Sequence, residues 1–265
     1  MLGKNQFIKN TTHRLGLTRG TGLRQLTMRG AFWTFFGFGL KQILRFASRT
    51  ILSYLILPEL FGIMTVVNVF ILGLDFFSDI GIIPNIVQSK RGDDPQFLNT
   101  AWTVQIGRGI LLWLTTLLIA LPVANFYHND IYRIVLPITG LAALIGGFKS
   151  TKLATAQRKL HMRDIIIIEL IGYGSGLTVM LTWAYLQPSI WALVAHGLTQ
   201  AVVEMSLSHL LLKGERNRFA WERKAVNEMF FFGRWIFLST ALTFLARESN
   251  KLIVARVMDE RFVGI

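Results

Sequence analysis

Three cations stand at four-residue intervals in an otherwise apolar segment: Lys41, Arg45 and Arg49. On an α-helix this interval advances about 400° per step, so the three side chains form one slowly drifting stripe, which Trp33 and Gly37 extend. The guanidinium group of Arg is a planar fork of donors that binds phosphate oxygens in pairs. The spacing therefore predicts that the stripe binds a phosphate group, provided that it faces water inside a helical bundle.

The stripe lies too deep in its segment for all of its cations to reach the membrane surface. The apolar runs 31–40 and 46–57 are each shorter than the roughly 20 residues of a spanning helix, so the span must include some cations. Arg49 lies eight residues before the outer end of the segment, or about 12 Å. Because an Arg at mid-bilayer costs about 3 kcal/mol, we expect Arg45 and Arg49 to face a cavity. The alternatives are snorkelling, which suits Lys41 best, and an ion pair with an acidic side chain.

Three further ionisable residues could act with the stripe. Arg108 is near the start of a later apolar segment, where it either joins the phosphate-binding surface or anchors the cytoplasmic end of its helix. Asp75 and Asp79 share one helix face, because they are four residues apart. They can pair with the cations of the stripe, which is the favoured interpretation, or bind a coupling proton or sodium ion.

A third charged group lies in the last apolar segment and consists of Arg247, Glu248 and Lys251. Glu248 and Lys251 are three residues apart, so their side chains can form an ion pair on one face of a helix. The sequence leaves two interpretations open for this group, namely a structural ion pair and a contact with substrate in a cavity.

No motif indicates catalysis, a metal site or a cofactor. The sequence has no cysteine, which excludes disulfides, thiolate catalysis and thiolate metal sites. It also lacks a His-x-x-x-His pair and the Gly-x-Ser-x-Gly turn of serine hydrolases. The run IGGFKST at 145–151 resembles a P-loop only superficially, because the glycine spacing fails and no strand precedes it. We therefore predict a protein that is not an enzyme.

The composition is that of an integral membrane protein. Of the 265 residues, 52% are hydrophobic and only 16% are charged, whereas soluble domains carry about 25% charge. The net charge of +13 is typical of a membrane protein whose basic connectors lie beside anionic lipid. Outside the apolar segments, no soluble domain remains that could bind nucleic acid. Membrane lipids are thus expected partners, and nucleic acid is not.

Seven segments are apolar and long enough to span a membrane as helices, which predicts an all-α fold with about seven transmembrane helices. The expected spans are 30–57, 60–83, 100–124, 131–148, 165–186, 190–212 and 229–258. The connectors after the second, fourth and sixth spans are longer and basic, and the others are short.

Positive charge is unequally divided between the two sides of the predicted membrane protein. Eighteen Lys and Arg residues lie in the N-terminal tail and the longer connectors, against two, Arg133 and Arg261, on the other side. Because positively charged segments stay in the cytoplasm, the N-terminus is predicted to be cytoplasmic.

Short motifs in a fixed order give the sequence a family resemblance. The stretch 55–90 contains a PxxFG turn, an SDxG sequence closing the second span and an IxQ segment, formed here by Pro58, Phe61, Gly62, Ser78, Asp79, Gly81, Ile86 and Gln88. FLNTAWTVQIGRGI at 97–110 is similar to the start of a third helix, and SNKLIVARVMDERFVGI at 249–265 to a seventh. In these features the protein resembles polysaccharide exporters of the lipopolysaccharide and colanic-acid type, within the multidrug/oligosaccharidyl-lipid/polysaccharide flippase superfamily.

The resemblance implies a domain organisation. Members of the superfamily have 12 to 14 helices in two bundles around a central cavity, so that by comparison the present sequence is expected to be truncated at its C-terminus. The expected division is a basic cytoplasmic tail at 1–29, an N-terminal six-helix bundle at 30–212, a cytoplasmic loop at 213–228 and the first helix of the second bundle at 229–265.

The resemblance also implies a function, namely flipping undecaprenyl-diphosphate-linked oligosaccharide repeat units across the bacterial inner membrane by alternating access. The diphosphate would bind the cations of the stripe, and polysaccharide polymerase and assembly proteins would be partners. Three alternatives stay open. A drug or metabolite antiporter that exports cations would need carboxylates in its cavity. A membrane enzyme would need a clustered catalytic site. A membrane scaffold of a polysaccharide assembly complex would bind its partners without transporting a substrate.

Overall fold

The computed structural model describes residues 23–257, apart from the side chains of residues 23, 24, 235, 240, 241 and 244–257. Helices are its only regular elements within this range, as the apolar segments predict. They are α2 (Leu23–Leu55), α3 (Pro58–Ser78), α4 (Ile82–Gln88), α5 (Pro95–Tyr127), α6 (Tyr132–Gly147), α7 (Lys152–Arg158), α8 (Met162–Leu186), α9 (Ile190–Leu210) and α10 (Arg223–Val257).

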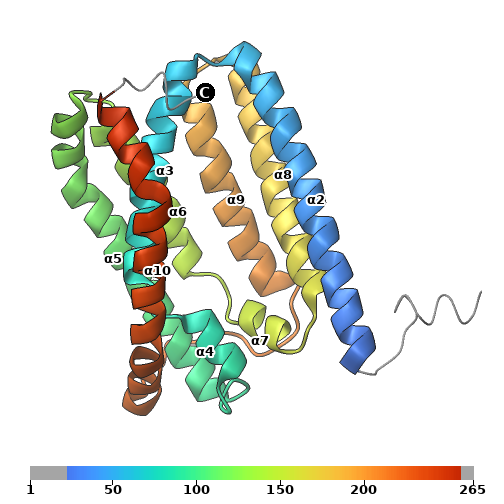
Figure 1. The fold of residues 1–265 in the computed structure, drawn as a ribbon. Helices are drawn as coiled ribbons and strands as arrows, with labels where there is room; N and C mark the ends of the chain where they lie inside the picture. Colours follow the sequence, from blue (N-terminus) through green and yellow to red (C-terminus); the bar gives the residue numbers. More distant parts are fainter. Residues whose placement is uncertain (1–22, 258–265) are drawn as a thin grey trace, which may run out of the picture.

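The long helices lie side by side as a bundle (Figure 1). α5 packs on α6, α8 on α9 and α2 on α8, while α6 also packs on α9 and α10 packs along α3. The three longer connectors, with α4 and α7 in two of them, lie at one end of the bundle, and the short connectors lie at the other (Figure 1). The alternation of long and short connectors in the sequence thus corresponds to the two ends of the molecule.

Proline and capping residues define several helix ends. α3 and α5 both begin with a proline, Pro58 and Pro95, where the missing N–H costs no helical hydrogen bond. The side chain of Asp94 caps α5 by accepting a hydrogen bond from the backbone N–H of Gln96 at 3.0 Å. His128 ends α5 in the left-handed conformation, and the backbone then turns into α6.

The second span is shorter than the sequence predicts. The apolar run extends to Ile83, but α3 ends at Ser78 and α4 begins only at Ile82. Asp79 accepts a hydrogen bond from the backbone N–H of Gly81 at 2.8 Å, and Gly81 adopts a positive φ of 63°. This turn interrupts the helix, because a residue in the left-handed conformation cannot continue a right-handed α-helix.

Four helices among the described residues are long and apolar enough to cross a membrane: α3, α5, α8 and α9. A fifth span results if α6 and α7, which are bent by 61° relative to each other, are taken together. α2 and α10 are outside this set, although the sequence predicts that both span. Lys41, Arg45 and Arg49 interrupt the apolar sequence of α2. Because α2 packs along α8, which does qualify, we treat α2 as a spanning helix as well.

Three of the four groups of buried apolar side chains in the described residues join most of the long helices. The first joins α3, α5, α6 and α9 around Val67, Tyr132 and Leu136. The second, around Ile86, Phe97 and Met229, joins α4, α5, α7 and α10 at the end with the long connectors. The third joins α2 to α8 and α9 and fixes how α2 is turned about its axis. Its buried members are Leu52, Ile56, Leu177, Met180, Ala184 and Ala192.

Candidate anion-binding site

One face of α2 packs tightly on α8. Gly37 leaves no room for a larger residue, because an added Cβ would lie 2.4 Å from a methyl group of Ile166. Ser48 and Leu52, further along the same face, are buried. Lys41 belongs to this face too, and its ammonium group forms an ion pair with Glu169 of α8. The first cation of the stripe therefore has a carboxylate partner that the sequence did not indicate.

Arg45 and Arg49 lie on the flank beside this packing face. Each follows a residue of the packing face by one position, so each is turned about 100° further around the helix. Both side chains are exposed, and neither forms an ion pair with a carboxylate whose side chain the structure describes. Exposed apolar residues such as Ile43 and Tyr54 occupy the other flank of α2. Over residues 43–54, the two arginines and the exposed side chains of Ile43 and Tyr54 thus lie on opposite flanks of α2.

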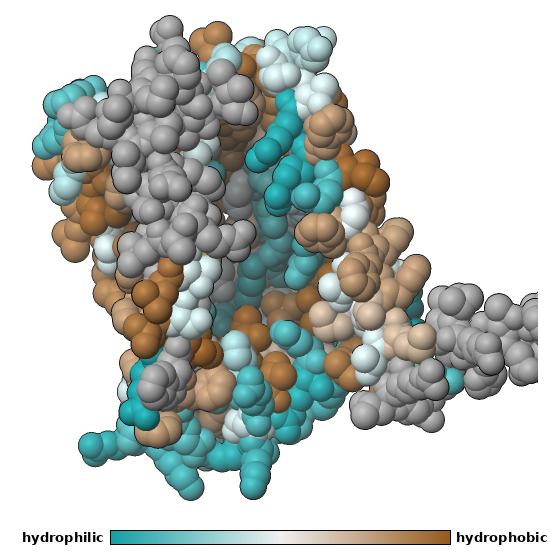
Figure 2. Space-filling view, viewed as in Figure 1, coloured by the Kyte–Doolittle hydropathy of each residue, from teal (hydrophilic) through white to brown (hydrophobic). Residues whose placement is uncertain are grey.

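Arg45 on the cationic flank lies within electrostatic range of α9. Arg45 interacts electrostatically with His196 of α9, which stacks edge-on with Tyr173 of α8 at a centroid distance of 5.2 Å. Figure 2 shows that the molecule is hollowed beside α2 and that hydrophilic side chains gather along the α2 side of this hollow. The predicted cavity-facing position of Arg45 and Arg49 is consistent with this arrangement.

Arg108 is not brought to the cations of α2. Its guanidinium group pairs with Asp75 of α3 at 2.6 Å, and its Nε donates to the backbone oxygen and the hydroxyl of Ser78 at 3.0 Å. Asp79 stabilises the turn after α3. Asp75, Asp79 and Arg108 line a separate cavity of about 420 Å³ between α3, α5 and α6, together with Gln105 and Lys149.

These contacts also bear on the interpretation that Asp75 or Asp79 neutralises the stripe. Asp75 is held by Arg108, and Asp79 is held by the turn, so the described carboxylate that reaches the stripe is Glu169. The remaining predicted group, Arg247, Glu248 and Lys251, lies in α10, but its side chains are outside the described residues.

Another ion pair joins Lys149, just after α6, to Glu204 of α9 at 2.6 Å. Glu204 is only 8% exposed, and Gln200 donates a further hydrogen bond to it at 2.7 Å. Sequence reasoning assigned Lys149 to a basic connector and missed the pair. The available signal was that Glu169 and Glu204 are rare acids within apolar segments, where an acid implies a cationic partner.

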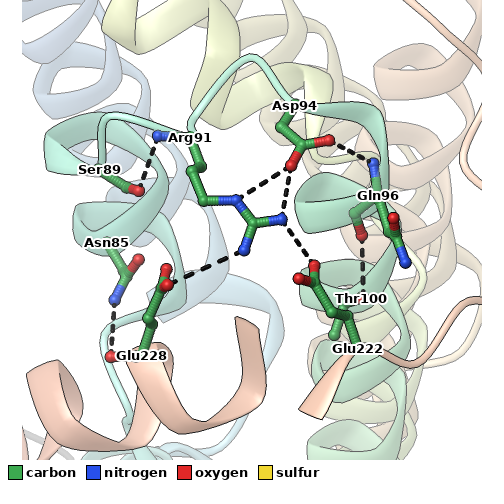
Figure 3. A network of polar contacts seen from close by, with 8 residues as sticks. All are labelled: Asn85, Ser89, Arg91, Asp94, Gln96, Thr100, Glu222 and Glu228. Carbon is green, nitrogen blue, oxygen red and sulfur yellow. Dashed lines mark hydrogen bonds and ion pairs between the residues drawn. The ribbon is translucent and has the colours of Figure 1, made fainter. Parts of the chain in front are cut away.

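At the end with the long connectors, Arg91 lies at the centre of a charged cluster (Figure 3). Its guanidinium group pairs with Asp94 at 2.6 Å, with Glu222 at 2.7 Å and with Glu228 of α10 at 3.9 Å. Hydrogen bonds to Glu222 and Asp94 raise the pKa of Arg91 above its usual range, and the Arg91 bond lowers the pKa of Asp94. The cluster connects the α4–α5 loop with the start of α10.

Most of the sequence matches a known family. The family model for polysaccharide biosynthesis proteins matches residues 51–265. The protein belongs to this family. It is therefore an all-α, multi-pass membrane protein of a polysaccharide biosynthesis family, as the resemblance of its motifs predicted.

Two relatives are similar over nearly the whole sequence. The lipopolysaccharide biosynthesis protein WzxC of Escherichia coli (strain K12) is 24% identical over 249 residues, which cover 91% of this protein and 49% of WzxC. An uncharacterized membrane protein in the cps region of Klebsiella pneumoniae is 24% identical over 247 residues, covering 91% of this protein and 50% of that one. The 265 residues thus span about half the length of these relatives. No solved structure matches.

Proposed function

We propose that this protein is a polysaccharide transporter of the bacterial inner membrane, which flips diphosphate-linked oligosaccharide lipids for surface polysaccharide biosynthesis. One observation carries the proposal. Arg45 and Arg49 lie side by side on an exposed flank of a membrane helix, Arg45 within electrostatic range of His196 of α9, and neither forms an ion pair with a described carboxylate. Because such cations are costly in a bilayer, a recurring anionic ligand explains why they stand there.

The two flanks of α2 suit the two halves of such a lipid. The guanidinium groups of Arg45 and Arg49 bind the diphosphate through paired hydrogen bonds, and the sugars occupy the hydrophilic hollow. The polyprenyl tail stays in the bilayer. Alternating access would expose the hollow first to the cytoplasm and then to the outer side. A transporter that exports cationic drugs is disfavoured, because it would need carboxylates to bind them, whereas this flank carries Arg45 and Arg49.

We further propose that the end with the long basic connectors faces the cytoplasm, and that polymerase and assembly proteins are partners of the transporter. Eighteen of the twenty Lys and Arg residues outside the spans belong to that side in the sequence. An anionic headgroup then leaves a compartment that is negative inside. Its outward movement is favoured by about 2.3 kcal/mol per charge and 100 mV of membrane potential.

Flipping in proteoliposomes tests the proposal. The protein is reconstituted, and a fluorescent undecaprenyl-diphosphate oligosaccharide is added to one leaflet, after which its appearance in the other leaflet is measured. The double variant R45Q/R49Q should flip at least about tenfold more slowly, since each lost charge-assisted contact is worth about 1.5–3 kcal/mol.

The matched control is R133Q, which removes an exposed arginine of α6 that pairs only with Asp130 among the described residues. It should flip at the rate of the unchanged protein. Normal flipping by R45Q/R49Q would refute the role of the two arginines. Absence of flipping by the unchanged protein would refute transport itself.

A further inference from the structure

A second basic cavity lies between the first turns of α2 and the start of α8. Its volume is about 290 Å³, and its charged or aromatic lining consists of Arg29, Trp33, His161, Arg163 and Asp164. It does not share a lining residue with the cavity around Arg108. Neither the proposed transport mechanism nor the packing of the bundle uses these side chains.

The two arginines of this cavity are available for a ligand. Within the described residues, Arg29 forms no ion pair or side-chain hydrogen bond, and Arg163 contacts only the ring of Trp33, at 5.5 Å from its centroid. The wall carries one carboxylate, Asp164, and the ring of His161 is exposed. With His161 neutral, two arginines against one aspartate leave a charge of +1, which favours an anion.

The position of the cavity indicates which anion. It lies at the end of the bundle that carries the long basic connectors, and Trp33 is of the residue type that is enriched at the membrane interface. Basic pockets between spanning helices at such an interface bind lipid headgroups. We propose that this cavity binds the headgroup phosphate of an anionic phospholipid. The exposed rings of Phe32 and Phe36, stacked at 6.2 Å, lie next to it on α2 and would contact the acyl chains.

This lipid site is separate from the proposed diphosphate site. Arg29 and Arg49 belong to one series of four-residue steps, and each step turns by about 40° beyond a full circle. Five steps amount to about 200°, so α2 presents the two arginines on opposite flanks. Between them Gly37 is in close contact with Ile166, which closes the seam between α2 and α8. A bound phospholipid can therefore remain in place while substrate occupies the hollow.

Lipid retention measures this site directly. The protein is reconstituted in vesicles of phosphatidylcholine and phosphatidylglycerol in equal amounts, and the lipids that remain bound are counted by native mass spectrometry. The unchanged protein should retain phosphatidylglycerol in preference. R29Q/R163Q should lower this preference at least about fivefold, because a basic residue near an anionic surface contributes about that factor.

A second variant guards against misfolding. His161 occupies the N-cap position of α8 but forms no capping hydrogen bond through its imidazole, and Asp is a better N-cap residue than His. H161D should therefore fold at least as well, yet it places a negative charge in the cavity and should also lower phosphatidylglycerol retention. Unchanged retention in a folded H161D protein would overturn the proposal.

Two controls separate this site from general electrostatics and from the substrate site. K213Q/R216Q removes two exposed charges from the same end of the molecule, outside the cavity, and should keep the preference. An equal loss of the phosphatidylglycerol preference in K213Q/R216Q would show that anionic lipid is attracted by the basic surface as a whole, and would reject the site. R45Q/R49Q should keep phosphatidylglycerol as well, whatever its flipping rate, and a loss would reject two separate lipid sites.

Discussion

The three cations of α2 have the same spacing but different surroundings. Lys41 packs toward α8 and is neutralised by Glu169, whereas Arg45 and Arg49 are exposed on the flank beside the packing face. The difference follows from the drift of about 40° per four residues, which turns each successive cation further from the packing face. Glu169 therefore competes with any anion for Lys41, and the number of cations available to a diphosphate is two or three, depending on this ion pair.

The competition is testable with E169Q. Removing the carboxylate frees Lys41, so we expect undecaprenyl diphosphate to bind several-fold more tightly, up to about tenfold for one added charged contact. Tryptophan fluorescence titration in detergent micelles measures the affinity. D130N, which removes an exposed carboxylate at the other end, serves as the control and should change nothing. Weaker binding by E169Q would mean that the ion pair builds the site instead of restricting it.

The pair of Lys149 and Glu204 predicts a change in stability at the same scale. K149M leaves the Glu204 carboxylate, only 8% exposed, without its cation, while Gln200 still donates one hydrogen bond. We expect a loss of about 2 kcal/mol in unfolding free energy. K149M/E204M should recover most of it. Thermal unfolding, monitored by circular dichroism, measures the stability of each variant. Equal stability of K149M and the unchanged protein would contradict this expectation.

Among the elements, α10 is attached to the bundle at one end by charge. Arg91 holds Asp94, Glu222 and Glu228 together, so the α4–α5 loop, the last connector and the start of α10 form one unit (Figure 3). α10 also packs along α3 and α5. A movement of α10 relative to these helices would have to break the Arg91 cluster first.

Acid should loosen the α4–α5 loop within this cluster. The hydrogen bond from Arg91 lowers the pKa of Asp94 in the folded state, so its contribution to stability is present above the pKa of the unfolded state. The contribution is lost as the pH falls through the lowered pKa. We expect faster hydrogen exchange in residues 91–98 as the pH is lowered from about 7 to about 3, after correction for intrinsic rates. In the R91Q variant this exchange should be fast at both pH values. An exchange rate that does not change with pH in the unchanged protein would contradict the prediction.

The sequence predicts the long helices well and their partners poorly. Apolar length determines α5, α8 and α9, because the membrane requires continuous apolar helices there. The short helices α4 and α7 lie in segments that the sequence predicts as connectors, since seven residues give no usable periodicity. The partner of Lys41 is 128 residues away, so no local pattern could indicate Glu169 instead of Asp75. Arg108 is of a residue type that is common in anion-binding sites. Its actual partner on α3 depends on how the helices pack, which the sequence does not reveal.

At the scale of the whole molecule, the predicted orientation can be measured without background labelling. Because the sequence has no cysteine, single cysteines can be introduced at the two ends of the bundle. D130C stands at the short-connector end and E215C at the long-connector end, and both positions are exposed. A membrane-impermeant maleimide added to intact spheroplasts should label D130C alone. Labelling of E215C alone would reverse the orientation and remove the electrical argument for outward transport.

The long separation between Lys41 and Glu169 also has a consequence during synthesis. At about 5–20 residues per second, the 128 residues between them take roughly 6 to 26 s to translate. Throughout this interval α2 carries three cations and has neither Glu169 nor the α8 surface on which it packs. We therefore expect α2 to wait at the insertion machinery or at the membrane surface, and to enter the bilayer core only together with α8.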